Sequence, residues 1–225
     1  FITCTAAGDN KLSPKYFIRY VDVIPQLILT TGGKHIHIGK LGRLTLYRIR
    51  RALGRLGVNE ARFQYIPFVP SVWKALQEHR VNLYVASFPY GGARTLIEAM
   101  GAGVAIAIHQ HITSRLLSTV DIAFNGVLEW RNPKELYALT TRLNPNSLRL
   151  LGELGRKKYE ECYREDLLIN ALTDWESPFA APVIGNSFAT DEMQQALDIS
   201  TQVSISGALN RIINRALQRI KPLRA

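Results

Sequence analysis

The alternation of short apolar runs with longer amphipathic segments most constrains the fold of this 225-residue chain. Runs rich in β-branched and aromatic residues predict strands, and apolar residues spaced three and four apart predict helices. The expected strands are 1–5, 34–38, 61–66, 83–87 and 104–109, and the expected helices are 13–30 (with a kink or break at Pro25), 44–56, 71–79, 93–100, 113–118, 133–143 and 147–164. This pattern predicts an α/β fold in which helices cover both faces of a Rossmann-like parallel sheet.

Composition divides the chain into three parts. Residues 1–175 carry the whole alternation and predict one domain, whereas residues 176–189 contain two prolines and a glycine and are typical of a linker. Residues 190–225 predict a helical basic tail, in which 207–225 combines an apolar face with Arg211, Arg215 and Arg219. The chain opens in an apolar run without Met, so we expect a piece of a longer protein.

The formal net charge of +10 is concentrated in two segments. Residues 40–55 hold six basic residues and 207–225 hold five, and neither segment contains an acidic residue. Both segments fit solvated helix faces, and both fit contact with an anionic ligand or surface. We expect the tail to pack on a neighbouring domain, with contact to a membrane surface through 207–225 as the alternative. Nucleic-acid binding is not expected, because aromatic platforms and recognition modules are missing.

Several classes of protein are disfavoured by what the sequence lacks. Two cysteines, Cys4 and Cys162, are too few for a disulfide scaffold and favour a reducing, cytoplasmic location. Zinc-binding spacings, the Gly-x-Ser-x-Gly elbow and the P-loop pattern do not occur. His35 and His37 share one face of a strand without an acid or cysteine to complete a metal site, which favours a structural role. His109 and His111 end a strand, which is a better position for function.

The strongest local signal is the glycine pair Gly91–Gly92, which lies between a buried strand and a helix. The free N–H groups and the dipole of a helix start form an anion site, and glycine lets the backbone approach a phosphate. Arg94 and Thr95 could add side-chain donors. The alternative is a tight turn that binds nothing.

Two further residues lie at the same edge of the expected sheet. Lys11, in the loop after the first strand, can neutralise a diphosphate, although most lysines are simply solvated. Glu98, one turn into the helix after the glycine pair, can accept hydrogen bonds from ribose hydroxyls or can complement the helix dipole.

Three stretches of residues 1–175 resemble the carboxyl-terminal, nucleotide-sugar-binding half of a GT-B glycosyltransferase. They are Asn-Lys-Leu-Ser at 10–13, Tyr-Ile-Pro-Phe-Val-Pro at 65–70, and the segment 88–104 that begins Phe-Pro-Tyr-Gly-Gly-Ala-Arg-Thr. Within this fold the chain is most similar to the O-GlcNAc transferase and HMW1C-like group, which also has a Ser-Arg pair after the next strand, as in Ser114-Arg115 here.

The resemblance implies a role for each candidate residue. Lys11 would contact the donor diphosphate and Glu98 would lie near the ribose. The base would meet the backbone of Val69, with Ser71 or Trp73 beside it, and the phosphate would lie at the helix start, formed by Gly91, Gly92, Ala93, Arg94 and Thr95. Lys11 and Arg94 would stabilise the leaving diphosphate electrostatically, so neither a metal nor a cofactor is expected.

The implied reaction is transfer of a sugar from a nucleoside-diphosphate sugar, such as a UDP-sugar, to a protein or glycan acceptor. An amino-terminal domain would bind the acceptor. Many retaining GT-B enzymes carry Glu-x7-Glu here, but the first acid is replaced by Tyr90, which argues against that group. Two alternatives remain: a sugar-nucleotide epimerase of the same layout, and a non-catalytic module that binds a nucleotide or a protein.

Overall fold

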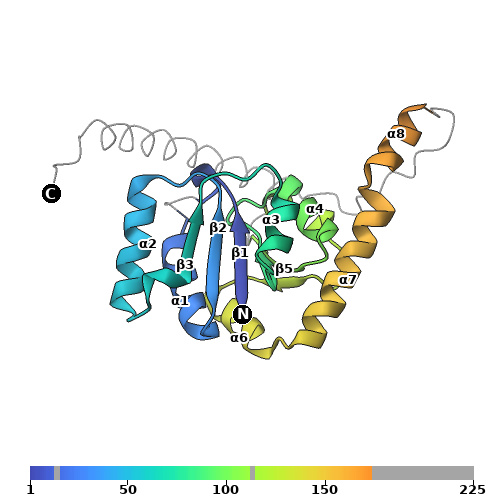
Figure 1. The fold of residues 1–225 in the computed structure, drawn as a ribbon. Coiled ribbons are helices and arrows are strands. Elements are labelled where there is room, and N and C mark those ends of the chain that lie inside the picture. Colours follow the sequence, from blue (N-terminus) through green and yellow to red (C-terminus); the bar gives the residue numbers. More distant parts are fainter. Residues whose placement is uncertain (13–15, 112–114, 174–225) are drawn as a thin grey trace.

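A parallel sheet forms the centre of the structure, a computed structural model that describes residues 1–12, 16–111 and 115–173 (Figure 1). The six strands lie in the order β3-β2-β1-β4-β5-β6, and all neighbouring pairs are parallel. The predicted Rossmann-like α/β fold is therefore confirmed. The strands are β1 (Ile2–Ala6), β2 (Lys34–Ile38), β3 (Phe63–Ile66), β4 (Leu83–Val85), β5 (Ala105–His109) and β6 (Leu128–Trp130).

Helices cover both faces of this sheet. One face packs against α1 (Tyr20–Thr31), α2 (Arg43–Arg55) and α6 (Pro133–Arg142), and the other against α3 (Val72–Glu78), α4 (Ala93–Gly101) and α7 (Pro145–Cys162). The remaining elements are α5 (Arg115–Ser118), α8 (Glu165–Thr173) and the 3-10 turns η1 (Asp9–Lys11), η2 (Glu60–Arg62) and η3 (Val120–Ile122). None of the helices in the described ranges has the length and apolar character needed to cross a membrane.

Two apolar clusters, one on each face, hold the layers together. Side chains alternate along the strands, so Leu83 and Val85 enter one cluster while Tyr84 enters the other. Because both faces are buried, β4 and β5 are almost uninterrupted apolar runs, as is typical of parallel sheets, whereas β1 and β2 bury threonines and histidines.

The basic helix α2 contacts the core through its apolar face. Ile49, Ala52 and Leu53 are buried, whereas most of its arginines are exposed, and Arg50 lies 3.7 Å from Glu60. This arrangement matches the interpretation of residues 40–55 as a solvated helix face.

Several boundaries differ from the sequence prediction. The first helix begins at Tyr20 rather than at residue 13, since residues 16–19 form an irregular segment that buries Tyr16 and Ile18. That helix continues through Pro25, so the break considered there does not occur. The long helix α7 begins at Pro145, because Asn144 caps it in a capping box. The short strand β6 and the helix α8 were not predicted.

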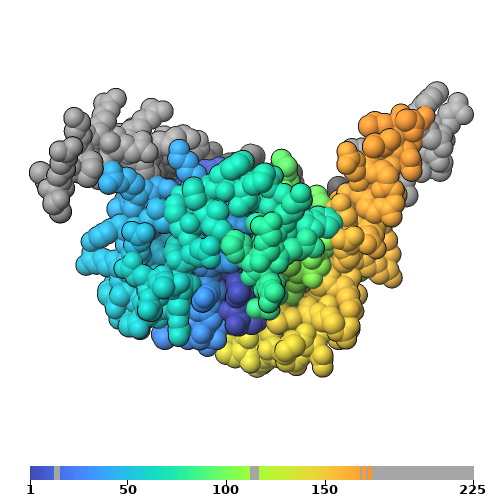
Figure 2. Space-filling model, viewed as in Figure 1, coloured from blue at the N-terminus to red at the C-terminus, as the bar shows by residue number. Residues whose placement is uncertain are grey.

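Helix α8 continues the direction of α7 and extends beyond the body of the domain (Figure 1, Figure 2). Some predictions lie outside the described residues. These are the linker at 176–189, the tail at 190–225 with its membrane contact, Ser13 of the first stretch, and Ser114 of the Ser-Arg pair.

Helix α7 packs close to the backbone that precedes β5. A Cβ placed on Gly152 would lie 2.1 Å from the Gly103 carbonyl oxygen, which is closer than any real contact. By contrast, a Cβ on Gly54 in α2 would meet nothing within 4 Å. The α4–α7 layer therefore depends on glycine at position 152.

We predict that Gly152→Ala destabilises the domain by roughly 1–3 kcal/mol, because the added methyl forces α7 away from the sheet. The matched control is Gly54→Ala, which should leave stability unchanged or raise it by up to about 1 kcal/mol through helix propensity. Urea unfolding of both variants tests this difference. Equal stabilities would contradict the packing described here.

Candidate functional site

The candidate site lies where the order of the strands reverses. Strands β1 and β4 are neighbours, but the chain leaves β1 toward β2 and leaves β4 toward β5 on the opposite side. At such a switch point the loops after the two strands diverge and leave a crevice beyond their carboxyl ends. The loop after β1 carries Lys11, and the loop after β4 leads into α4. The loop with Lys11 and the glycine-containing loop before α4, both predicted to belong to the site, therefore lie together at this crevice.

Lys11 lies against the backbone at the start of α4. A Cβ placed on Gly92 would lie 3.1 Å from Lys11 Nζ, so a side chain at this position would crowd the ammonium. The lysine belongs to η1, which is tied to the next loop because the Asp9 N–H donates to the Lys40 carbonyl (3.0 Å) and Thr45 Oγ1 donates to Asp9 Oδ1 (2.8 Å). Partial burial lowers the pKa of Lys11. The ammonium is therefore positioned rather than freely solvated.

The start of α4 supplies backbone donors at the same point. Its N-cap is Gly92, which has no side chain to cap the helix, and the first intrahelical bond is from the Leu96 N–H to the Gly92 carbonyl (2.9 Å). The N–H groups of Ala93, Arg94 and Thr95 are thus the ones that helix geometry leaves without an intrahelical acceptor. Their direction and the helix dipole favour an anion.

The two glycines have different roles. A Cβ on Gly91 would lie 2.2 Å from Thr119 Oγ1 and 2.7 Å from the Ser118 carbonyl oxygen, and the Gly91 N–H donates to the Leu117 carbonyl (2.8 Å). Gly91 therefore packs against the segment before η3. Gly92 keeps open the space beside Lys11.

The hydroxyl groups around this turn are used within the protein. Tyr84 OH donates to Thr95 Oγ1 (2.9 Å), which in turn donates to the Gly92 carbonyl (3.0 Å), and Ser87 Oγ donates to the Tyr90 carbonyl (2.7 Å). The Thr95 hydroxyl thus shapes the turn, and its backbone N–H is the candidate ligand donor. Sequence reasoning missed the role of Tyr84 in supporting this turn, because a tyrosine in a buried strand cannot be distinguished from an ordinary core residue.

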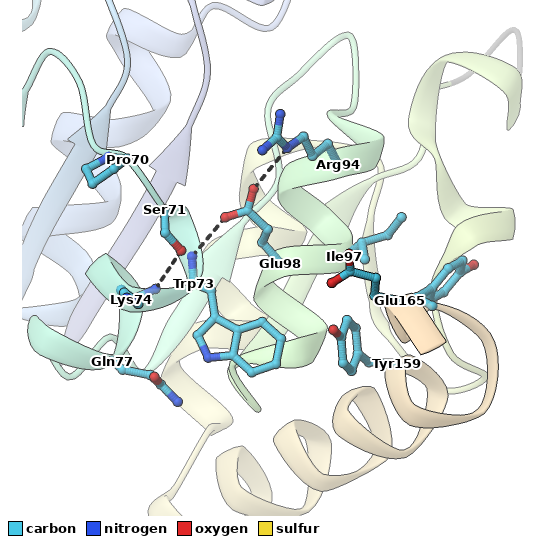
Figure 3. Close-up of a pocket in the computed structure, with 11 residues that line it drawn as sticks. Pro70, Ser71, Trp73, Lys74, Gln77, Arg94, Ile97, Glu98, Tyr159 and Glu165 are labelled. Atoms are coloured by element: carbon cyan, nitrogen blue, oxygen red, sulfur yellow. Dashed lines mark hydrogen bonds and ion pairs between the residues drawn. The ribbon is translucent and has the colours of Figure 1, made fainter. Parts of the chain in front are cut away.

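Glu98 links α4 to the start of α3. Its Oε2 accepts a hydrogen bond from the Trp73 N–H (3.0 Å), and its Oε1 lies 3.3 Å from Arg94 Nε (Figure 3). Ser71 caps α3, since its Oγ accepts from the Lys74 N–H (3.3 Å). Glu98 and Arg94 are thus paired with each other in the structure.

A pocket of about 830 Å³ runs from these residues along α4 toward α7 and α8 (Figure 3). Ser71, Arg94 and Glu98 line its upper part, and Trp73 and Tyr159 lie farther along it. The side chain of Val69 packs on the core, so a contact of its backbone with a base stays a prediction. Most of the predicted residues therefore form two neighbouring groups at the first turns of α4. One is the cradle, in which Lys11 of η1 lies against Gly92 and the N–H groups of 93–95, and the other is the Arg94–Glu98 pair.

A chain of hydrogen bonds holds the loop that carries Lys11. His37 Nε2 lies 3.0 Å from the Ala7 carbonyl, so it carries a proton, and His37 Nδ1 accepts from Tyr20 OH (2.7 Å). Tyr20 OH then accepts from His35 Nε2 (2.9 Å), and His35 Nδ1 accepts from Thr3 Oγ1 (2.8 Å). This sequence of donors and acceptors accommodates two neutral histidines, and burial favours that form because it lowers the pKa of both. It gives them the structural role that the sequence favoured.

His109 has a similar role on the other side of the site. Its Nδ1 donates to the Trp130 carbonyl (3.1 Å) and its Nε2 accepts from Tyr16 OH (2.7 Å). His109 is buried. The end of strand β5 suggested a functional role for His109, but its contacts in the structure give it a structural one.

Among the described residues, no three His, Cys, Asp or Glu side chains come together in a way that could hold a metal ion. Donor binding without a metal stays a prediction.

The fold is that of one half of a GT-B glycosyltransferase. A mutant of the Thermobaculum terrenum O-GlcNAc transferase is 17% identical, with a TM-score of 0.57 over 97% of this chain and 37% of that one. HepE from Anabaena, in complex with UDP and glucose, is 12% identical, with a TM-score of 0.54 over 77% of this chain and 48% of the HepE chain. A glycosyltransferase from Rickettsia africae is 12% identical, with a TM-score of 0.53 over 90% of this chain and 47% of that one. The chain thus spans less than half of each structure. No protein-family model and no curated protein matches it.

The buried histidines predict a pH dependence of stability. Burial lowers the pKa of His37 and His109 to about 4 and that of His35 well below its usual value. The unfolded chain takes up these protons near pH 6.5, whereas the folded chain does not, so stability should fall as the pH drops from about 6.5 to about 4. Each histidine contributes at most about 1.4 kcal/mol per pH unit.

Urea unfolding at pH 7.5, 6.5 and 5.5 measures this slope, in a range where carboxylates contribute little. His37→Gln should reduce the slope, and His79→Gln, outside the network, should keep it. A stability that stays constant from pH 7.5 to 5.5 would contradict neutral histidines in the folded state.

Proposed function

We propose that this chain provides the donor-binding half of a glycosyltransferase and holds the diphosphate of a nucleoside-diphosphate sugar at the start of α4. The observation that carries the proposal is the position of the Lys11 ammonium against the uncapped N-terminus of that helix. Both features are positive, so their proximity costs electrostatic energy unless an anion lies between them. The glycosyltransferase fold, and the UDP and glucose in the HepE structure, support a nucleotide sugar as that anion.

In this proposal the cradle stabilises the leaving group. As the bond from the sugar to the diphosphate breaks, negative charge grows on the outer phosphate. The Lys11 ammonium and the N–H groups of Ala93, Arg94 and Thr95 are positioned in advance to neutralise that charge, which is electrostatic catalysis. These donors can serve where other enzymes use a metal ion. Glu98 would face the ribose, and Val69 and Ser71 would meet the base.

The acceptor, a protein or a glycan, would bind to an amino-terminal domain that also supplies any general base. This part of the proposal is supported by the share of the neighbouring glycosyltransferases that the chain spans, between 37% and 48% for the three compared above. A sugar-nucleotide epimerase would convert the donor sugar without an acceptor, and a binding module would leave the donor unchanged. Product analysis after incubation with a donor separates these three activities.

The proposal predicts that one of the diphosphates UDP, GDP and ADP binds with micromolar affinity in calorimetric titration. Lys11→Met should weaken that binding by about 10- to 100-fold, the usual loss for a charge-assisted hydrogen bond. Lys157→Met is the matched control, because it removes the same charge from an exposed position on α7. It should bind as the unaltered chain does.

Two results would contradict the proposal. One is a folded chain that binds none of the three diphosphates. The other is a Lys11→Met variant that binds as tightly as the control.

A further inference from the structure

Arg94 is directed away from the phosphate cradle. Its Nε lies 3.3 Å from Glu98 Oε1, one helical turn farther along α4, and its side chain is 89% exposed (Figure 3). The three side-chain atoms nearest to a Cβ on Gly92 belong to Thr95, Lys11 and Ser87. The cation in the cradle is therefore Lys11, while Arg94 lines the upper part of the pocket.

Helix energetics do not explain an arginine at this position. A cation in the first turn of a helix is unfavourable with the dipole, and a basic residue four positions before an acid is the weaker orientation of such a pair. Exposed ion pairs of this kind also add little to stability. The arginine therefore fits a role toward a ligand better than a role in folding.

Glu98 is held from two separate elements. Trp73 N–H from α3 donates to Oε2 (3.0 Å), Arg94 Nε approaches Oε1, and the glutamate side chain is only 20% exposed. A carboxylate offers about four lone-pair sites, so two internal donors leave about two sites for others. Because Glu98 lines the pocket, these sites are available to a ligand that enters it.

We propose that Arg94 is a positioning residue for the sugar ring of the nucleotide: it fixes Glu98 so that the carboxylate accepts hydrogen bonds from the ribose hydroxyls. Arg94 itself makes no contact with the diphosphate. The assignment rests on the proposed function, because it requires a nucleoside diphosphate in the site. It divides recognition between Lys11, which binds the anion, and the Arg94–Glu98 pair, which distinguishes ribose from a ring without hydroxyls.

The test compares two forms of one nucleotide by calorimetric titration. The diphosphate that binds in the panel of UDP, GDP and ADP is measured beside its 2′,3′-dideoxy form, and the ratio of the two affinities reports recognition of the ribose hydroxyls. In the unaltered chain we expect this ratio to be at least about tenfold, the loss usual for a single hydrogen bond to a charged acceptor. Arg94→Ala should reduce the ratio most of the way to one, as Glu98→Gln should, with the affinity for the dideoxy form unchanged.

Three further variants make the result specific. Arg94→Lys keeps the charge without the planar guanidinium and should restore part of the ratio. Lys11→Met should weaken both nucleotide forms by the same factor and leave the ratio intact. Arg149→Ala breaks another exposed pair of the same spacing, Arg149–Glu153 on α7, and should change nothing.

Two outcomes would overturn the assignment. If Arg94→Ala weakens both nucleotide forms equally, Arg94 contacts the diphosphate directly. If it weakens neither, the pair is a surface ion pair only. Failure of the proposed function is visible separately, because the unaltered chain would then bind none of the ribonucleotides.

Discussion

The site depends on one pairing, in which β1 and β4 lie side by side as parallel strands. Thr3 aligns with Leu83 and Cys4 with Tyr84, although β2 and β3 lie between them in the sequence. Since the chain departs from the two strands in opposite directions, their carboxyl ends bring Lys11 and the start of α4 together. A change that shifted this register would separate the ammonium from the backbone donors without altering any site residue.

The electrostatics at the start of α4 favour an anionic ligand. The Lys11 ammonium, the helix dipole and the Arg94 guanidinium all bring positive charge to the first turn of α4. The acid paired with Arg94, Glu98, also accepts a hydrogen bond from the backbone of α3. Behind the site, uncharged histidines hold the loop in place, so the charge near the crevice comes from groups that face it.

The sequence predicted the fold well because both faces of the sheet are buried. Apolar runs such as 104–109 identify the strands, and the glycine pair at 91–92 identifies the turn. It could not separate the roles of the two glycines, since Gly91 meets Thr119 only through the tertiary fold. The hydrogen bond from the Trp73 N–H to Glu98 could not be predicted from the sequence either, because it joins a side chain to a backbone group on another helix. Strand β6 escaped prediction because three residues carry too little periodicity.

The central claim is that a nucleoside diphosphate binds at the start of α4, beside Lys11. The most direct measurement is a ¹⁵N NMR titration of the labelled chain with UDP, GDP and ADP in turn. With the diphosphate that binds, we expect the largest amide shifts on Ala93, Arg94 and Thr95, with Lys11 shifting in parallel. Shifts concentrated on the basic helix α2, or the absence of shifts at the start of α4, would contradict it.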